Sequence, residues 1–338
     1  MKEFYERSYQ GDFGKKTEAF RWITGNNPFR DRNNNYILIF KNDRMAGYWG
    51  LMPIRFYFLG KAIEGVFSQE ALIDPYCRRE GIATKLLKEI NQSGNFMISL
   101  WHNEKVLAIL KKGGWVDVGN YQPLKKIYCL ENLLKLKLKN RLLREMITIF
   151  LESYYKMRGS KLKNGSHYSI EFTRKCSNEF DHFFMKVAPK LGILSDRTAV
   201  ILNWKYIDVP YKEYLFLTAR KNGRISGYIV LRIEEQDCKI RKGIIVDLLC
   251  DPDEPETLIC LAKKCDEIFL ENKVDFSVCL VKPNIFRDIF IKNGYFKAKS
   301  KDTDSIWIYN QHKSPNRELT KNINSWYFTY GDSDGDMW

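Results

Sequence analysis

The sequence predicts an α/β fold, of the α+β kind, that occurs twice along the chain. First, an apolar strand at residues 66–73 runs directly into a glycine-containing turn and a helix. Second, short strands and short helices alternate on both sides of this segment. Third, the same order of elements returns between residues 214 and 295. We therefore expect two tandem units, each with a mixed, mostly antiparallel sheet that is flanked by helices.

The composition limits the class of protein. The chain has 338 residues, which is enough for two domains with a full core each. No segment approaches the length of a membrane span and the first residues form no apolar leader, so we expect a cytoplasmic protein. The eight cysteines lack metal-ligand spacing, so free thiols and no metal site are expected. The formal net charge of +14 favours an anionic partner, but without a nucleic-acid-binding signature no specific nucleic acid is expected.

The first unit is expected over residues 1–130. It begins with a helical segment that ends at the polar turn around Pro28. Alternating strands and polar turns then predict two hairpins. In chain order, the expected elements are strands 36–40, 45–51, 55–59, 61–66 and 66–73, helix 83–91, strand 95–100, helix 104–112 and a strand that begins at residue 115.

A basic, amphipathic linker is expected over residues 131–165. Apolar residues recur through residues 131–158 at helical spacing, and lysines and arginines fill much of the opposite face. The favoured interpretation is a helix between two domains, with its apolar stripe packed on the protein. The alternative is weak contact with a membrane surface or another polyanion.

The second unit is expected over residues 166–312. Its predicted elements are strands 214–219, 225–233 and 243–250, helix 257–271, strand 276–280 and helix 284–292. The apolar strand 243–250 meets Asp251-Pro252, just as the strand of the first unit meets Asp74-Pro75. Acidic residues follow in the second unit, where a pyrophosphate would be repelled. We expect this unit to shape an acceptor pocket and to bind no nucleotide.

The turn after strand 66–73 has the chemistry of an anion site. Gly81 and Ala83 leave little side-chain bulk over the backbone N–H groups, and a helix begins beside them. A second segment begins at Asn103 and ends in Gly114-Trp115. The spacing Arg78-x-x-Gly81-x-Ala83, together with this second segment, resembles the GNAT superfamily of acetyl-CoA-dependent N-acetyltransferases. The chain looks like a tandem GNAT protein with a degenerate second domain.

The resemblance implies a cofactor site in the first unit, with acetyl-CoA as cosubstrate. Backbone groups at the end of the strand would hold the pantetheine arm, the loop amides would hold the pyrophosphate, and an asparagine would lie near the sulfur. On this sequence the implied cofactor-binding residues are Leu72, Ile73, Arg78, Arg79, Gly81, Ala83, Thr84 and Asn103.

The catalytic residues are predicted from position and chemistry. The two-residue period of a strand places Ser68, Glu70 and Leu72 on one side, so Glu70 is the candidate general base. The family's usual tyrosine acid corresponds to Leu110, which cannot donate a proton. His102 is therefore the candidate for protonating the leaving thiolate, with water as the alternative.

The C-terminal tail, residues 313–338, is unusually aromatic before it becomes acidic, which predicts docking near the active site. We expect Asp332, Asp334 and Asp336 to line an acceptor site and bind a cationic amine, with Asp334 a candidate catalytic residue. In some tandem GNAT proteins the chain terminus supplies a catalytic carboxylate. The alternative is an acidic surface tail. The ending also resembles GNAT-type proteins of surface-polysaccharide synthesis, so an amino sugar is the expected acceptor.

Together these expectations describe an enzyme that moves an acetyl group from acetyl-CoA to a primary amine by direct attack in a ternary complex. Two alternatives belong to other functional classes. One is a tRNA-dependent aminoacyl or peptidyl transferase of tandem GNAT fold. The other is a protein that binds acyl-CoA without catalysis.

Overall fold

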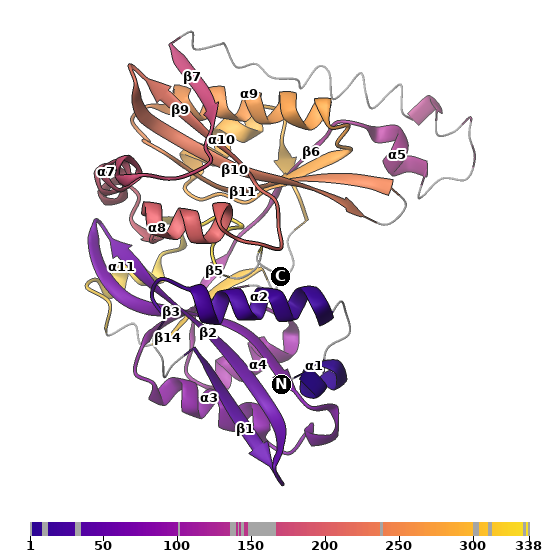
Figure 1. Ribbon diagram of the computed structural model, residues 1–338, viewed down its shortest axis with the longest axis vertical. Helices are drawn as coiled ribbons and strands as arrows, with labels where there is room; N and C mark the ends of the chain where they lie inside the picture. Colours follow the sequence, from indigo (N-terminus) through magenta and orange to yellow (C-terminus); the bar gives the residue numbers. More distant parts are fainter. Residues whose placement is uncertain are drawn as a thin grey trace.

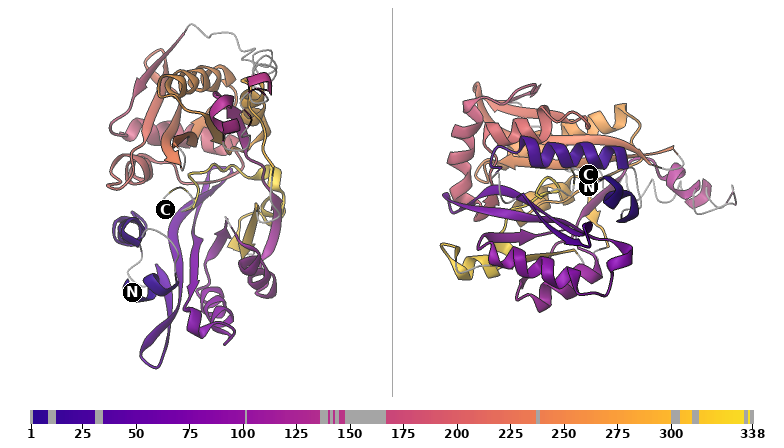
Figure 2. Two further views of the ribbon diagram at one scale, coloured as in Figure 1. Left: turned by 90° about the vertical axis from the view of Figure 1, so that its right-hand side faces the viewer. Right: turned by 60° about the horizontal axis from the view of Figure 1, so that its bottom comes forward.

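The computed structural model forms two α/β units stacked on each other, the first drawn in indigo to purple and the second in pink to orange (Figure 1). Two further views show each sheet with its own helices (Figure 2). The structure describes residues 2–8, 13–30, 35–100, 102–135, 140, 142, 145–147, 167–236, 239–299, 304–309, 313–333 and 336.

The sheet of the first unit has the strand order β1-β2-β3-β4-β14-β5, and β8 extends the far end of β2. All its neighbouring strands are antiparallel except β3 and β4, which run parallel. Its strands are β1 (Tyr36–Lys41), β2 (Arg44–Phe58), β3 (Lys61–Ile73), β4 (Phe96–Ser99), β5 (Val116–Asn120), β8 (Ile193–Ser195) and β14 (Ser305–Tyr309).

The long hairpin of β2 and β3 replaces four expected short strands. The two strands pair from the Leu59-Gly60 turn, where both residues have positive φ, to the far end near Gly47 and Ile73, with one β-bulge between Trp49 and Leu51. The expected break between two of the short strands falls on Met52-Pro53-Ile54, but Pro53 stays opposite Val66 and β2 continues through it. The β1–β2 turn was predicted, and its Asn42 and Asp43 have φ of +49° and +59°, as a two-residue hairpin turn requires.

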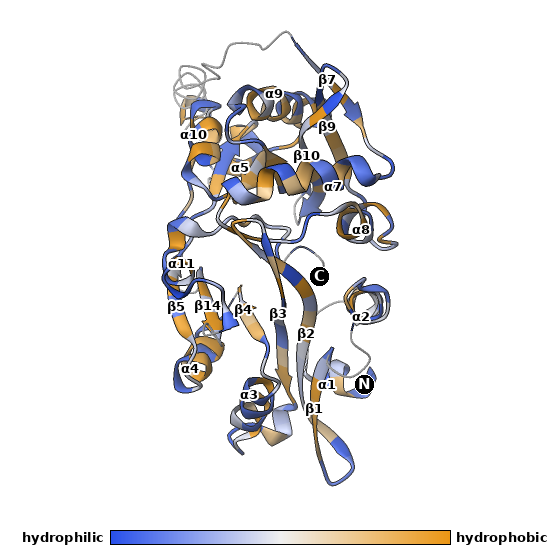
Figure 3. Ribbon diagram, turned by 90° about the vertical axis from the view of Figure 1, so that its left-hand side faces the viewer, coloured by the Kyte–Doolittle hydropathy of each residue, from blue (hydrophilic) through white to orange (hydrophobic). Residues whose placement is uncertain are grey.

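Helices cover both faces of the first sheet (Figure 3). On one face lie α1 (Lys2–Ser8) and α2 (Phe13–Asn26), and on the other lie α3 (Ile82–Gln92) and α4 (Glu104–Lys112). The α3 and α4 face buries an apolar cluster that includes Trp49 and Leu110. The α1 face buries a smaller, aromatic cluster. The sheet therefore separates two environments, which meet where β3 and β4 part.

The second sheet has the order β13-β6-β12-β11-β10-β9-β7, and only β11 and β12 are parallel. Its strands are β6 (Leu124–Ile127), β7 (Tyr168–Phe172), β9 (Leu215–Lys221), β10 (Arg224–Gln236), β11 (Ile240–Cys250), β12 (Phe276–Cys279) and β13 (Phe296–Lys297). The helical elements of this half and of the C-terminal segment are α5 (Leu130–Lys135), α7 (Asn178–Val187), η2 (Ala188–Lys190), α8 (Ala199–Leu202), η3 (Asn203–Ile207), α9 (Pro255–Glu271), α10 (Asn284–Lys292), α11 (Arg317–Lys321) and η6 (Ile323–Ser325).

The first sheet receives β8 and β14 from the second half of the chain, and the second sheet receives β6 from the first half. β6 follows β5 in sequence but inserts between β12 and β13, and β14 follows β13 but inserts between β4 and β5. Figure 1 shows the yellow β14 within the lower unit. The expected boundaries 1–130 and 166–312 therefore do not coincide with the two sheets. Neither β6 nor β14 was among the expected strands, and the pattern of so short a strand does not identify its partner, so this exchange was missed.

The basic linker is described only in part. Its first turns form α5, in which Lys135 pairs with Glu131 across one helical turn. Residues 148–166, which include the end of the predicted helix 131–158, lie outside the described residues. The choice between an interdomain helix and a membrane-surface contact remains a prediction.

Candidate active site

The parallel pair of the first sheet opens into a gap. β3 and β4 are paired from Gly65 opposite Phe96 to Ser68 opposite Ser99, where β4 ends. β3 continues to Ile73 and is paired there only with β2. Within the part of the chain that the structure describes, no strand pairs with that edge of β3 over residues 69–73. Such an edge can bind an extended ligand as an added strand would.

A cavity of about 590 Å³ lies along this open edge. It brings together six of the eight cofactor residues that the GNAT resemblance implied, while Gly81 and Thr84 stand beside it in the same turn and helix. The lining residues are Ser8, Trp49, Ala71, Leu72, Ile73, Arg78, Arg79, Ala83, Leu86, Asn103, Lys105, Val106 and Ile109.

The loop that closes the cavity has the backbone of an anion site. Arg79 and Gly81 both have left-handed backbone, with φ of +67° and +77°, and Gly81 is the N-cap of α3. A Cβ atom built on Gly81 would meet no atom within 4 Å, so the space above the loop is open. The N–H groups of the first turn of α3 have no carbonyl partner within the helix and carry its positive dipole end. An anion can therefore lie against this loop without a metal ion.

Two ion pairs hold the loop in place. Lys41 Nζ lies 2.6 Å from Glu80 Oε2. Asp74 accepts a hydrogen bond from the N–H of Tyr76, which starts the turn η1 (Pro75–Cys77). The other carboxylate oxygen of Asp74 pairs with Arg7 of α1 at 3.0 Å. α1 thus fixes the strand end next to the loop, and its Ser8 lines the cavity.

A β-bulge in β3 changes the expected direction of Glu70. Trp49 faces Ala71 and Leu51 faces Ser68, so β3 carries one more residue than β2 at this point. Ser68 accepts a hydrogen bond from Trp49 on the α3 face. Glu70 instead accepts one from Tyr5 of α1 at 3.3 Å, on the opposite face. The expectation that Ser68 shares a side with Glu70 and Leu72 is therefore wrong, because the two-residue period fails across a bulge.

His102 and Asn103 lie in the connection between β4 and α4. Asn103 accepts a hydrogen bond from the N–H of Val106 and so caps α4, while it also lines the cavity. The Nε2 atom of His102 lies 2.9 Å from Ser99 Oγ, at the last paired position of β4. Leu110 is fully buried in the cluster below α4. His102, the predicted proton donor, therefore lies near the point where β3 and β4 part.

The C-terminal segment 326–333 lies between the two units, where Figure 2 shows part of the yellow chain. Its side chains alternate as those of a strand do. Trp326 and Phe328 pack into the core of the first unit, and Tyr327 packs into that of the second. The backbone bonds β8 through Tyr327 N and Ile193 O at 2.7 Å.

The same segment fills the gap of the second sheet. β11 and β12 part after Ile245 opposite Cys279, the counterpart of the gap in the first sheet. There Thr329 bridges to Val281, and Gly331 N donates to Val246 O at 2.7 Å. The space that a pantetheine arm would need is therefore occupied by the protein's own chain. This arrangement agrees with the expectation that the second unit binds no CoA, which stays a prediction.

The acidic residues of the tail already have protein partners. Asp332 is buried and accepts from Arg197 at 2.7 Å, from Ser195 and from the N–H of Thr329. Burial by itself raises the pKa of Asp332, but the charges of Arg197 and Lys205 hold that pKa below its usual value. Asp336 accepts hydrogen bonds from residues of the second unit, Arg232 and Tyr214, at 2.8 Å each.

The expectation that Asp332 and Asp336 line an acceptor site is therefore wrong, since both carboxylates anchor the tail. Sequence alone did not show that Arg197 would supply the opposite charge. Asp334, the candidate catalytic residue of the tail, lies outside the described residues.

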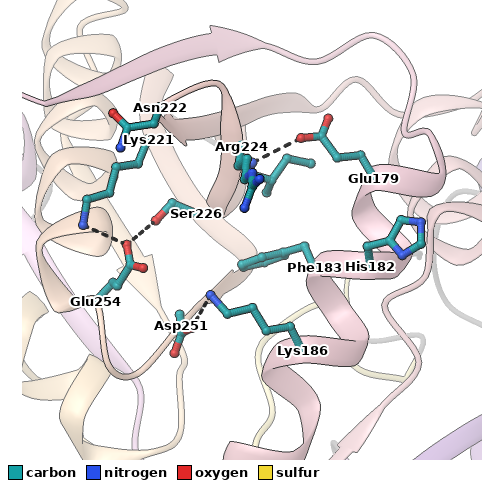
Figure 4. Close-up of a pocket in the computed structure, with 11 residues that line it drawn as sticks. Glu179, His182, Phe183, Lys186, Lys221, Asn222, Arg224, Ser226, Asp251 and Glu254 are labelled. Carbon is teal, nitrogen blue, oxygen red and sulfur yellow. Dashed lines mark hydrogen bonds and ion pairs between the residues drawn. The ribbon is translucent and has the colours of Figure 1, made fainter.

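The corresponding strand end of the second unit is built from acids and cations that pair with each other (Figure 4). Asp251 lies 2.7 Å from Lys190 and 3.1 Å from Lys186. Burial raises the pKa of Asp251, but these lysines hold it below its usual value. Glu254 stands at the N-cap of α9, where it accepts from Ser226 at 3.1 Å and pairs with Lys221. A carboxylate thus takes the place that a phosphate would occupy.

Two residues of the first unit were missed by the sequence analysis. Gln69 stands at the bulge, is 8% exposed, and its Nε2 atom has no hydrogen-bond partner among the described residues. The Gln69 side chain lies over the backbone of Gly50, because a Cβ atom built on Gly50 would be 3.1 Å from Gln69 Oε1. Ser8 likewise has a buried Oγ without a partner in the described chain, on the wall of the cavity. Ser8 is thus a polar group on the wall of the cavity, Gln69 is a buried polar group of the strand beside it, and neither stands in a recognisable motif.

Solved structures share this fold. A GCN5-related N-acetyltransferase from Anabaena variabilis is 14% identical, with a TM-score of 0.60 over 91% of this chain and 68% of that chain. A Saccharomyces cerevisiae N-myristoyltransferase with bound myristoyl-CoA is 10% identical, with a TM-score of 0.53 over 87% and 79%. Eis1 from Mycobacterium abscessus is 14% identical, with a TM-score of 0.51 over 89% and 72%. No family model and no curated protein matches the sequence.

The chain therefore has the GNAT fold, as the sequence motifs predicted, and its two sheets are consistent with two tandem units of that fold. At these identities the likeness shows the fold alone. Within the described residues, no helix has the length and apolar character of a membrane span, and no three side chains are grouped as metal ligands.

Proposed function

We propose that the protein is an acyl-CoA-dependent N-acyltransferase that uses acetyl-CoA and a primary amine. The observation that carries the proposal is the cavity that joins the open edge of β3 to the loop at the start of α3. This geometry offers strand-edge hydrogen bonds and an anion site in one continuous space. Acyl-CoA requires both, because its flexible arm carries amides and its nucleotide end carries a pyrophosphate.

In the proposed complex the pyrophosphate lies against the loop of Arg79, Gly81, Ala83 and Thr84. The pantetheine arm follows the edge of β3 past Ile73 and Leu72. The thioester then lies near the point where the strands part, close to Asn103. A backbone N–H of β3 at this edge would stabilise the oxyanion that forms when the amine attacks.

Glu70 is the proposed general base. Its bond to Tyr5 places it on the α1 face, so the amine would approach from the side opposite α3. A second cavity, of about 620 Å³, opens between α1 and α2, and Tyr5 lines it. Two aromatic side chains, Tyr5 and Phe20, line this cavity, and behind them both pack against the buried Tyr48. Such rings suit the apolar face of a sugar, so an amino sugar is the acceptor class that we propose.

The remaining steps use fewer protein groups. The neutral amine attacks the thioester carbon, a C–N bond forms, and the C–S bond breaks as the tetrahedral species collapses. His102 is the proposed donor of a proton to the leaving thiolate, and its place beside Ser99 supports that role. No covalent acyl-enzyme is needed.

A protein that binds acyl-CoA without catalysis is the second candidate. The position of the family's tyrosine holds Leu110, which is fully buried and offers no proton. If His102 does not replace that tyrosine, the site would bind the donor without turning it over efficiently. The two candidates differ in amine-dependent release of free thiol.

The test measures CoA thiol release from acetyl-CoA with a panel of amino sugars and simple amines. We expect amine-dependent release by the wild type and a loss of about 100-fold or more in Glu70→Gln. Glu64→Gln is the matched control, since Glu64 is an exposed glutamate of the same strand. Binding of acetyl-CoA without release by any amine would favour the second candidate. Equal activity of Glu70→Gln and wild type would exclude Glu70 as the base.

A further inference from the structure

Aromatic side chains of the C-terminal segment lie beneath the point where β3 and β4 part. Phe67 and Ile98 are the last pair but one of the parallel strands. Phe328, 4% exposed, packs its ring against Tyr121 with centroids 5.4 Å apart, within the cluster that contains Phe67. Trp326 belongs to the same cluster and donates its Nε1–H to Thr320 O.

These side chains leave almost no free space. The cavity that remains has a volume of about 10 Å³, which is no more than one water molecule needs. Its walls are mostly apolar and come from the first unit, including β8 and β14, and from the C-terminal segment. They are Phe56, Phe67, Ile98, Leu100, Leu194, Ser195, Ile306, Trp326, Tyr327, Phe328 and Asp332.

The geometry of the donor site directs the acyl group toward this cavity. The anion loop lies past the C-terminal end of β3, and the parting point lies near Ser68. Between Asp74 and Gln69 the strand covers roughly 17 Å, at about 3.3 Å per residue. An arm anchored at the loop and running along this edge ends near the parting point. An acyl group at its end would continue toward Phe67 and Leu100.

We propose that Phe328 and Trp326, together with Phe67, restrict the donor to short acyl groups, of two to about four carbons. A longer chain would have to displace rings that are packed on all sides, whereas an acetyl group needs little space beyond the parting point. The C-terminal segment 326–333 thus limits the length of the acyl group, although none of its residues lines the cavity that holds the rest of the donor. This inference rests on the proposed function, because it requires acyl-CoA in the cavity of the first unit.

The test compares acetyl-, butyryl- and octanoyl-CoA by calorimetric titration, so that it does not depend on transfer to an amine. We expect wild type to bind octanoyl-CoA about tenfold or more weakly than acetyl-CoA. Phe328→Ala and the milder Phe328→Leu should narrow that ratio by enlarging the space below the strands. Phe58→Ala is the matched control, because Phe58 is equally buried in the same cluster but does not line the cavity.

Each outcome decides a separate point. Equal affinity of wild type for acetyl- and octanoyl-CoA would overturn the inference, and this needs no variant. An unchanged ratio in folded Phe328→Leu, or the same change in Phe58→Ala, would remove Phe328 from the explanation. Binding of acetyl-CoA with the expected chain-length limit, but without amine-dependent turnover, would overturn the proposed function alone. Absence of binding by every acyl-CoA would overturn both.

Discussion

Arg197 makes the most strongly buried ion-pair network in the described chain, and replacing it tests how the C-terminal segment is held. Its guanidinium, 3% exposed, lies 2.7 Å from Asp332 and 3.2 Å from Asp247, and it donates to Ser195. The substitution Arg197→Met keeps much of the volume but removes the one guanidinium that pairs directly with both buried carboxylates, and leaves only the more distant charge of Lys205. Removing one partner of such a network costs about 3–5 kcal/mol, because the remaining charges stay desolvated.

The expected shift in melting temperature follows from this cost. At about 2.1 cal/mol/K per residue, the entropy of unfolding of 338 residues is about 0.7 kcal/mol/K, which gives a fall in Tm of about 4–7 °C. The matched control is Arg220→Met. Arg220 also joins two carboxylates, Glu171 and Glu179, but all three side chains are more exposed, so the cost should stay within about 1 kcal/mol.

The assay is thermal unfolding followed by far-ultraviolet circular dichroism, with a urea titration as a second measure. Equal Tm values for Arg197→Met and Arg220→Met would refute the reasoning, since they would show that burial of the network does not matter. Limited proteolysis should also release the C-terminal segment faster from Arg197→Met. Without that difference, the network would have no special role in holding the segment.

Three further predictions follow from single residues. The depressed pKa of Asp332 contributes to the free energy of unfolding at pH values above the unfolded pKa, near 3.9, and this contribution is lost as pH falls through the folded pKa. In urea titrations, the free energies of unfolding of wild type and Asp332→Asn should therefore approach each other in acid. If instead the difference between these two free energies were constant from pH 7 to pH 3, the charge of Asp332 would not be what stabilises the fold. Gln69→Leu should leave the free energy of unfolding unchanged or raise it, because the substitution removes a buried amide whose Nε2 atom has no partner among the described residues. If the Gln69 amide contacts the acceptor, the KM for the amine substrate should rise. An unchanged KM would mean that Gln69 does not contact the acceptor. Asn103→Ala should cost about 1 kcal/mol through loss of the helix cap, while Asn103→Ser restores stability and reports separately on CoA affinity; full stability of Asn103→Ala would contradict the capping role.

Local structure could be predicted well where a residue acts on its own neighbours. α4 and α10 begin and end at the expected residues, because Asn103 and Pro283 precede them and a glycine pair or an Asn-Gly pair ends them. The anion loop was also predicted, since Gly81 is needed for a left-handed backbone at the start of a helix. These features depend on a few consecutive residues.

Features that depend on distant partners could not be predicted. β6 and β14 pair with strands that lie more than 100 residues away in the sequence. The sequence of neither short strand indicates which strand it will pair with. The bulge at Gln69 reverses the side of Glu70, although the sequence there reads as a regular strand. Asp332 and Asp336 were assigned to a substrate because their partners, Arg197 and Arg232, lie far away in the sequence.

The most direct measurement of the central claim is a calorimetric titration of acetyl-CoA into wild type and two glycine variants. Gly81→Glu places a carboxylate on the anion loop. Gly223→Glu is the control, because Gly223 has the same φ of +77° and the same open surroundings but lies in the β9–β10 hairpin turn of the other unit. We predict that wild type and Gly223→Glu bind alike, whereas Gly81→Glu binds at least about tenfold more weakly. Equal binding by all three proteins, or none by wild type, would contradict a CoA site in the first unit.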